Sequence, residues 1–166
     1  MRVLLTVAYL AVLGFIFYNS LQTGERSSQQ STKVVDTVQN AVSVVAPQSP
    51  IATATGSDYD ALHSLIRSMA HFSEFALLGA VGILCVLSYT DKMPFVFFPL
   101  IGAVIVPIAD ETLQHFVADR GAEIKDVLVD MAGGACGMIF ALGCVFIGIC
   151  VWTWIACLRK RRTDKE

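Results

Sequence analysis

The stretch RSMAHFSEF, residues 67–75, joins a charged helix face to a membrane-crossing segment. Its Arg67, His71 and Glu74 stand at positions i, i+4 and i+7, a spacing that places all three side chains on one face of a helix. The sequence that follows is apolar and carries no further charge until Asp91. Ionisable side chains at membrane depth cost free energy and usually mark a functional site, so this face is the first candidate for one.

The composition is that of an integral membrane protein. Of the 166 residues, 55% are hydrophobic, whereas soluble domains are roughly 45–50% apolar. A helix needs roughly 20 residues to cross the hydrocarbon core, and the apolar runs provide for four such helices. We therefore expect a single all-α domain over residues 1–166, a bundle of four transmembrane helices. The expected spans are residues 3–19, 69–89, 94–113 and 130–157.

A polar segment rich in Ser, Thr and Gln, residues 20–66, separates the first two spans. Within it, positions 34–45 carry valines at roughly helical spacing, which favours a short amphipathic helix on the membrane or on the bundle. Valine is a weak helix former, so a flexible loop is the alternative.

Topology follows from the basic residues, which gather at the two termini and in one turn. The positive-inside rule then predicts that both termini and this turn are cytoplasmic and that the polar segment and residues 110–130 face outward. The tail 159–166 is expected to lie against anionic lipid, and a nucleic-acid role is not expected. Seven of the twelve basic residues support this topology: Arg2, Lys92, Arg159, Lys160, Arg161, Arg162 and Lys165.

Two neighbouring spans are short and polar at the same, outward end, which predicts a shared cavity there. Asp110 and Gln114 are four residues apart and share a helix face, and Pro107 is expected to kink the third span so that Asp110 points inward. The expected site residues are His71, Glu74, Asp110 and Asp126 as catalytic groups and Arg67, Glu111, Gln114, Arg120 and Asp130 as ligand-binding groups.

Three interpretations of this outward site stay open. Arg67 and Arg120 suit a phosphate or carboxylate head group, with His71 beside Glu74 or Asp110 supplying acid–base chemistry. Alternatively, the ionisable groups form a structural network that ties helix ends together. A metal site is the third interpretation, because carboxylates with a histidine on helices resemble the ligands of bundle metal sites. We expect no metal, and the sequence assigns no cofactor.

Four motifs follow one another along the chain: Ser20-Leu21-Gln22, Arg67…His71-Phe72-x-Glu74-Phe75, Asp110-Glu111-x-x-Gln114-x-Phe116, and Arg120 with Asp126…Gly133-Gly134. Together they resemble the VanZ-like family of bacterial membrane proteins. The resemblance covers nearly the whole chain, apart from the long segment 20–66, which compact members lack. It implies a cell-envelope setting in the bacterial cytoplasmic membrane, and the founding member is associated with low-level resistance to the glycopeptide antibiotic teicoplanin. In the family an amide often stands where this chain has Asp130.

The expected function is therefore to bind or modify an anionic envelope lipid or a lipid-linked precursor at the outward site. The alternative is a non-enzymatic structural membrane protein whose polar network only ties helix ends together. The lipid bilayer is the expected surrounding, and the sequence leaves both enzyme activity and a homo-oligomer undecided.

Overall fold

A computed structural model describes residues 1–90 and 92–163, and over these residues the regular elements are all helices. Four of them are long and apolar enough to cross a membrane. The predicted fold class, an all-α protein with four membrane-length helices, is confirmed, and the chain is a multi-pass membrane protein. The elements are α1 (Arg2–Ser20), α2 (Gly24–Val45), α3 (Ser57–Tyr89), the 3-10 helix η1 (Met93–Val96), α4 (Phe97–His115) and α5 (Ile124–Thr163).

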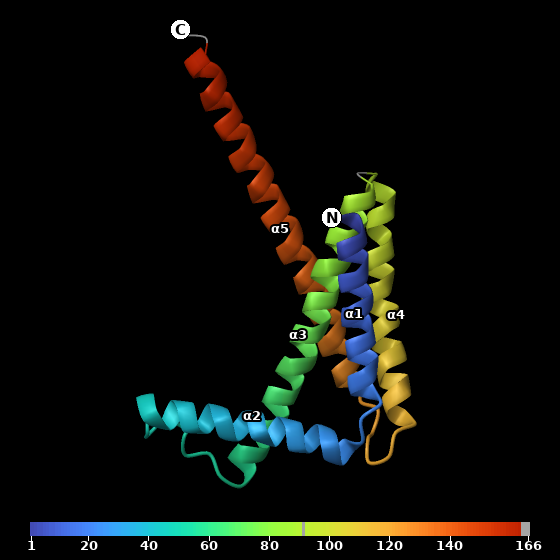
Figure 1. Cartoon of the computed structure of the whole chain (residues 1–166). Coiled ribbons are helices and arrows are strands. Elements are labelled where there is room, and N and C mark those ends of the chain that lie inside the picture. The colour runs from blue at the N-terminus through green and yellow to red at the C-terminus, as the bar shows by residue number, and fades with distance from the viewer. Residues whose placement is uncertain (91, 164–166) are drawn as a thin grey trace.

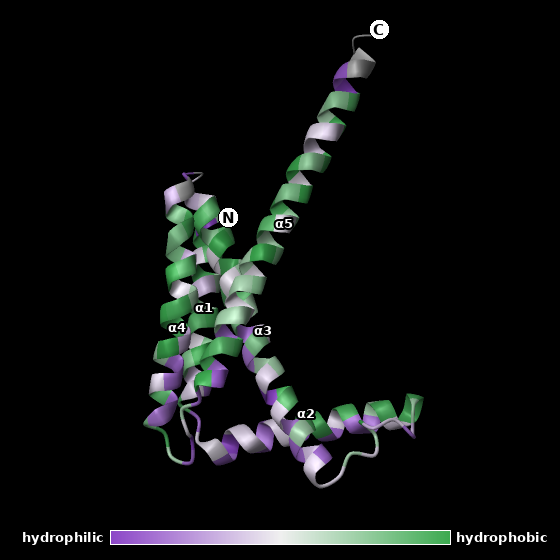
Figure 2. Cartoon of the chain, turned by 180° about the vertical axis from the view of Figure 1, so that it is seen from behind, coloured by the Kyte–Doolittle hydropathy of each residue, from purple (hydrophilic) through white to green (hydrophobic). Residues whose placement is uncertain are grey.

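Helices α1, α3 and α4 run side by side, and the first half of α5 packs against α3 (Figure 1). The second half of α5 diverges from the bundle. The N-terminus, the connection between α3 and α4 and the C-terminal end of α5 all lie toward one end. Polar residues gather at the opposite end, called here the polar end, where α2 and the loop 116–123 are found (Figure 2). Two apolar clusters fill the bundle: Ile16 with Phe75 and Leu78, and Ile83 with Met138 and Ala141.

Helix α2 lies crosswise at the polar end (Figure 1). Its N-terminus is capped by Thr23, whose hydroxyl accepts a hydrogen bond from a backbone N–H of the first turn. It packs against the first turns of α3, where the Tyr59 hydroxyl donates to Asp36 at 3.2 Å and Val35 is fully buried. Of the two structures that the sequence left open for this segment, the chain therefore forms the amphipathic helix.

Glycines allow α3 and α5 to approach at backbone distance. A methyl group added to Gly133 would overlap the carbonyl oxygen of Phe72, and one added to Gly137 would overlap the carbonyl oxygen of Ala76. Membrane helices have little hydrophobic drive to associate, so such close packing of small residues supplies much of the attraction. Two glycines four residues apart are common by chance in apolar sequence. In this protein Gly133 and Gly137 form the surface of α5 that contacts α3.

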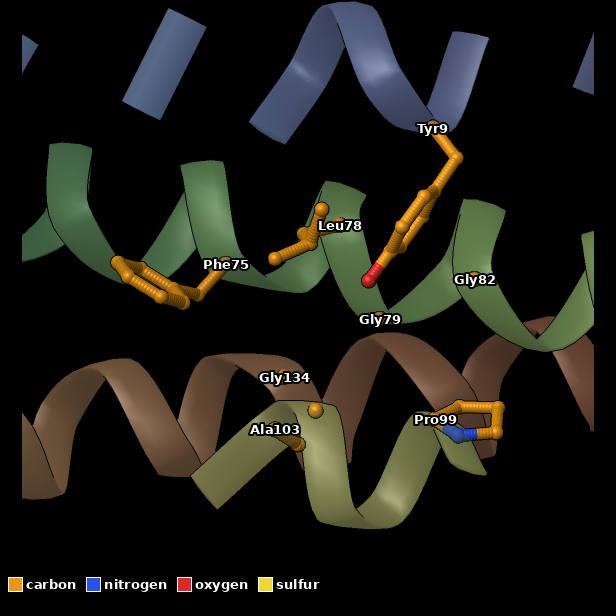
Figure 3. Close-up of a pocket in the computed structure, with 9 residues that line it drawn as sticks. Tyr9, Phe75, Leu78, Gly79, Gly82, Pro99, Ala103 and Gly134 are labelled. Carbon is orange, nitrogen blue, oxygen red and sulfur yellow. The ribbon is translucent and has the colours of Figure 1, made fainter. Parts of the chain in front are cut away.

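The centre of the bundle holds one small apolar cavity, where α1, α3, α4 and α5 meet (Figure 3). The Tyr9 ring lies against Gly82, and the backbones of Gly79 and Gly134 are in contact beside it. The cavity has a volume of about 10 Å³, which is room for a single water at most. This cavity is therefore too small to hold a ligand.

We expect Gly137→Ala to lower the melting temperature of the detergent-purified protein by about 5 °C. The added methyl overpacks the contact with Ala76, which costs about 1–3 kcal/mol. Gly143→Ala, on the same helix, is the matched control. The methyl group that it adds has no described atom of a neighbouring element within 4 Å. The melting temperature of this control should stay equal or rise, since alanine favours helix over glycine. Equal losses in both variants would contradict the close helix contact.

Candidate functional site

The polar end buries side chains that a membrane protein seldom buries. Ser20, Asp110, Glu111, Gln114 and Asp130 are each at most 4% exposed, and they come from α1, α4 and α5. Buried ionisable groups need partners, because removal from water costs free energy that only hydrogen bonds or opposite charges offset. The site is therefore defined by the hydrogen-bond and ion-pair partners of each buried polar group, and by the buried polar atoms that have none.

Asp110 is held by two uncharged donors. The Gln114 amide donates to its Oδ2 at 2.7 Å, and the Ser20 hydroxyl at the end of α1 donates to Oδ1. Asp110 and Gln114 do lie on one buried face of α4, with the buried Pro107 one turn earlier. Ser20 was not among the expected site residues, although it stands in the first family motif. These bonds fix the orientation of the Asp110 carboxylate without neutralising it.

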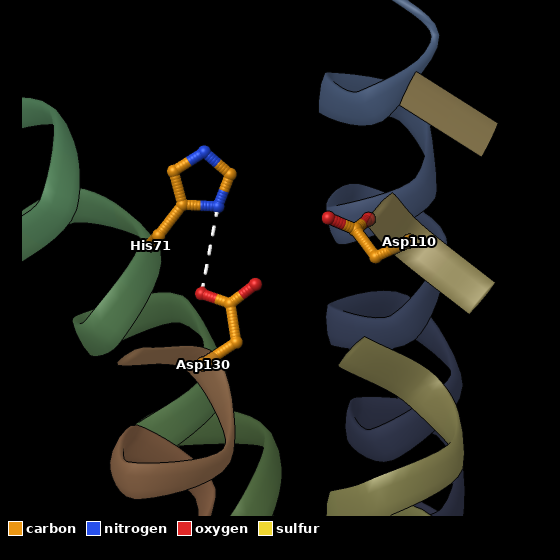
Figure 4. Close-up of side chains that lie close together, drawn as sticks. All are labelled: His71, Asp110 and Asp130. Atoms are coloured by element: carbon orange, nitrogen blue, oxygen red, sulfur yellow. Dashed lines mark ion pairs between the residues drawn. The ribbon is translucent and has the colours of Figure 1, made fainter. Parts of the chain in front are cut away.

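His71 of α3 lies against Asp130 of α5, with 3.6 Å between its Nδ1 and the Asp130 Oδ1 (Figure 4). This separation suits an ion pair when the imidazole is protonated, but it is too long for a hydrogen bond. Asp130 is fully buried, and neither of its carboxylate oxygens has a hydrogen-bond partner. Asp110 points toward the same space from α4 (Figure 4). The three side chains therefore surround one buried point.

Glu74 is engaged with a different helix. Its Oε1 accepts a hydrogen bond of 3.0 Å from the Asn19 side chain of α1. The structure thus pairs Glu74 with Asn19 and places Asp130 beside His71, whereas the sequence suggested Glu74 or Asp110 as the partner of that histidine. Spacing within one helix could not reveal a partner on another helix.

Arg120 ties the loop 116–123 to the end of α1. Its Nη1 donates to the carbonyl oxygens of Asn19 and Ser20 at 3.3 and 3.1 Å, and its Nη2 donates to the Ser27 hydroxyl at 2.8 Å. The last carbonyls of a helix lack intrahelical partners, so this guanidinium caps α1. Burial lowers the pKa of Arg120 and the charge of Arg67 lowers it further, while Asp110 and other carboxylates raise it. Arginine nonetheless stays protonated.

The same loop is tied to α2 and α4 through backbone groups. The Gly24 N–H donates to the Ala118 carbonyl at 3.1 Å, and a side chain at position 24 would overlap the backbone of the loop. The Glu111 Oε1 accepts a hydrogen bond of 2.6 Å from the Glu123 N–H, just before α5 begins. Its other oxygen, Oε2, is buried without a hydrogen-bond partner. Glu111 thereby joins the end of α4 to the start of α5.

Arg67 faces a polar hollow of about 130 Å³ between α3 and the start of α5. Its Nε is buried and has no hydrogen-bond partner. Asp126 lines the same hollow, and so does Lys125, whose ammonium lies 3.3 Å from the Glu123 carboxylate in an exposed pair. The hollow is lined by His63, Ser64, Arg67, Ser68, Glu123, Lys125 and Asp126.

The geometry divides the expected site residues into two groups. Arg120, Gln114 and Glu74 are committed to other parts of the protein through hydrogen bonds. Among the described residues, Arg67 and Asp130 have no side-chain hydrogen bond and keep buried polar atoms without partners, whereas Arg120 at its Nε and Glu111 at its Oε2 keep one such atom each beside the bonds that hold them. The first group can hold the polar end together, and the second can bind something from outside the chain.

We expect Arg120→Gln to lower the melting temperature of the purified protein by about 5 °C or more. It removes hydrogen bonds from a charged donor to Asn19, Ser20 and Ser27, and such bonds are each worth about 1.5–3 kcal/mol. Arg26→Gln removes the same charge from an exposed position on α2 and should leave the melting temperature unchanged. A melting temperature of Arg120→Gln equal to that of Arg26→Gln would contradict the capping role.

Comparison with known proteins gives one match. The model of the VanZ/LLP1 family matches residues 5–152, which confirms the resemblance that the sequence motifs indicated. A search of the curated proteins and a search of the solved structures each gave no significant match.

Proposed function

The chain belongs to the VanZ/LLP1 family, and from that premise we propose that it binds the anionic head group of an envelope lipid or a lipid-linked precursor at the polar end. One observation carries the proposal: the Arg67 guanidinium lines a polar hollow while its buried Nε has no hydrogen-bond partner. A buried charged donor without a partner is costly. A phosphate or carboxylate would supply that partner, because it fits the planar fork of arginine.

The hollow around Arg67 holds charges of both signs. Lys125 adds a second positive charge, but it pairs with Glu123 at 3.3 Å, and Asp126 adds a further carboxylate. His63 and Ser68 add donors that can turn toward an oxygen of an anionic ligand. The hollow lies between two membrane helices near the point where their apolar surfaces begin. A ligand with an anionic head and an apolar tail could place its tail along these surfaces.

We also propose that the polar end faces outward from a bacterial cytoplasmic membrane. Arg2, Lys92 and the basic tail 159–162 belong to the opposite end of the bundle, and the positive-inside rule places that end in the cytoplasm. The start of α1 and the C-terminal end of α5 both lie toward that end (Figure 1), as four crossings require.

The proposed orientation predicts that green fluorescent protein fused to the C-terminus fluoresces in bacterial cells, because it matures in the cytoplasm but not after export through the Sec pathway. Alkaline phosphatase fused at the same point should be inactive, because it needs the oxidising periplasm to form disulfides. The reverse pattern, a dark fluorescent fusion with an active phosphatase, would contradict the orientation.

The head-group proposal predicts that Arg67→Gln retains about tenfold less phosphatidylglycerol than wild type in native mass spectrometry. Losing one charge-assisted interaction of about 1.4 kcal/mol changes affinity by that factor. Retention of zwitterionic phosphatidylcholine should not change. Arg26→Gln is the control, since it removes one exposed arginine at the same end of the protein. Equal phosphatidylglycerol retention by both variants would overturn the proposal.

A link to teicoplanin resistance enters by family analogy alone. The same two variants test it in cells, through the minimum inhibitory concentration of teicoplanin with and without expression of the protein. If the link holds, wild type and Arg26→Gln raise that concentration and Arg67→Gln does not. If no form of the protein changes it, head-group binding in this chain is unrelated to teicoplanin.

The alternative is that the polar residues only tie helix ends together and bind no ligand. The hydrogen bonds of Arg120 to α1 and α2 favour it. It predicts that Arg67 acts in the same way as Arg120. Arg67→Gln would then lower the melting temperature as Arg120→Gln does and leave phosphatidylglycerol retention intact. The two measurements on the two variants therefore separate a binding site from a purely structural network.

A further inference from the structure

Three ligand-type side chains from three helices meet deep in the polar end. They are His71 of α3, Asp110 of α4 and Asp130 of α5, and one ligand atom of each lies within 4.8 Å of the others. Figure 4 shows their side chains directed toward the same space. None of the three is among the residues that line the hollow beside Arg67.

Asp130 shows that the cluster is incomplete. The residue is fully buried, and both of its carboxylate oxygens lack a hydrogen-bond partner. The His71 Nδ1 is likewise buried without one, at 3.6 Å from the Asp130 Oδ1. A buried carboxylate left in this state is strongly unfavourable unless a proton or a cation is added.

Asp110 is prepared in the way that metal-binding carboxylates usually are. Each of its oxygens accepts a hydrogen bond from a neutral donor, Ser20 on one side and Gln114 on the other. Outer hydrogen bonds of this type orient carboxylate ligands around metal ions. Each carboxylate oxygen has a further lone pair that remains available for a cation.

Among the described residues no arginine forms an ion pair with Asp110 or Asp130, although Arg120 is near enough to interact electrostatically with Asp110. The hydrogen bonds of Arg120 go to Asn19, Ser20 and Ser27, not to the carboxylates. Within the described residues, the ion pair with His71 is the only one that Asp130 makes, and Asp110 makes none. A positive ion at the centre of the cluster would neutralise both carboxylates together.

We propose that His71, Asp110 and Asp130 bind one divalent transition-metal cation of the Zn²⁺ or Mn²⁺ kind. An imidazole with two carboxylates suits these ions, whereas Mg²⁺ and Ca²⁺ favour oxygen ligands throughout. Ligand atoms around a tetrahedral zinc ion lie about 3.4 Å apart. The separation of 3.6 Å between His71 and Asp130 is close to this value, and a ligand atom of Asp110 lies within 4.8 Å of both.

Three protein ligands leave a coordination position open to water or to an oxygen of another molecule. The inference does not rest on head-group binding at Arg67, and either could hold without the other. It takes up the metal-site interpretation that the sequence left open and assigns it to His71, Asp110 and Asp130.

The test uses full-length protein in detergent, stripped with EDTA and dialysed against Zn²⁺ or Mn²⁺ before elemental analysis by mass spectrometry. Wild type should bind about one equivalent, and the metal should raise its melting temperature. Asp130→Asn and His71→Gln should each bind at least tenfold more weakly. His115→Gln is the control, because His115 is an exposed histidine at the same end. Wild type that binds no metal, or His71→Gln that binds as His115→Gln does, would overturn the proposal.

A second measurement needs no variant, in case Asp130→Asn does not fold. Co²⁺ bound by wild type to nitrogen and oxygen ligands gives visible absorption bands that Zn²⁺ should abolish by displacement. If these bands are absent and no metal is taken up, Asp110 and Asp130 carry protons instead and the proposal fails. Phosphatidylglycerol retention, measured on the same samples, shows separately whether head-group binding at Arg67 persists.

Discussion

The backbone contact between α3 and α5 is the constraint on which the polar end depends. Gly133 packs on the Phe72 carbonyl and Gly137 on the Ala76 carbonyl, so the two helices are fixed in register without intervening side chains. Phe72 directly follows His71, and Gly133 lies one helical turn after Asp130. The same contact therefore brings the imidazole and the carboxylate together. Larger side chains at the two glycines would separate these groups along with the helices.

A second constraint is that polar groups in a membrane protein must find partners inside the protein. At the polar end the short connections supply many of them, as Arg120 does for the last carbonyls of α1 and Glu111 does for the start of α5. The remaining unpartnered atoms include those of Arg67, His71 and Asp130. Arg120 and Glu111 hold the fold although each keeps one buried atom without a partner, whereas Arg67 and Asp130 make no side-chain hydrogen bond to the described chain and are the groups available to a ligand.

The two proposed ligands have opposite charges, and the arrangement of the polar end suits both. The outer hollow carries Arg67 and Lys125, whereas the inner cluster carries Asp110 and Asp130. A divalent cation in the inner cluster would offset the carboxylates that otherwise repel an anionic head group in the hollow. The two proposed sites are therefore compatible within one polar end, and a cation at the inner site would favour an anion at the outer one.

The sequence by itself determined the class of protein, the approximate positions of the four apolar helices and the family, because hydropathy and helical spacing are local properties. It also identified which polar residues belong to the ends of the spans. Only the tertiary structure decided their partners: Asp130 beside His71, Asn19 with Glu74, and Arg120 on the carbonyls of α1. Periodicity fixes the face of a helix that a residue occupies, but it does not fix the rotation and register of that helix against its neighbours. In this protein the glycine contacts between α3 and α5 set that register.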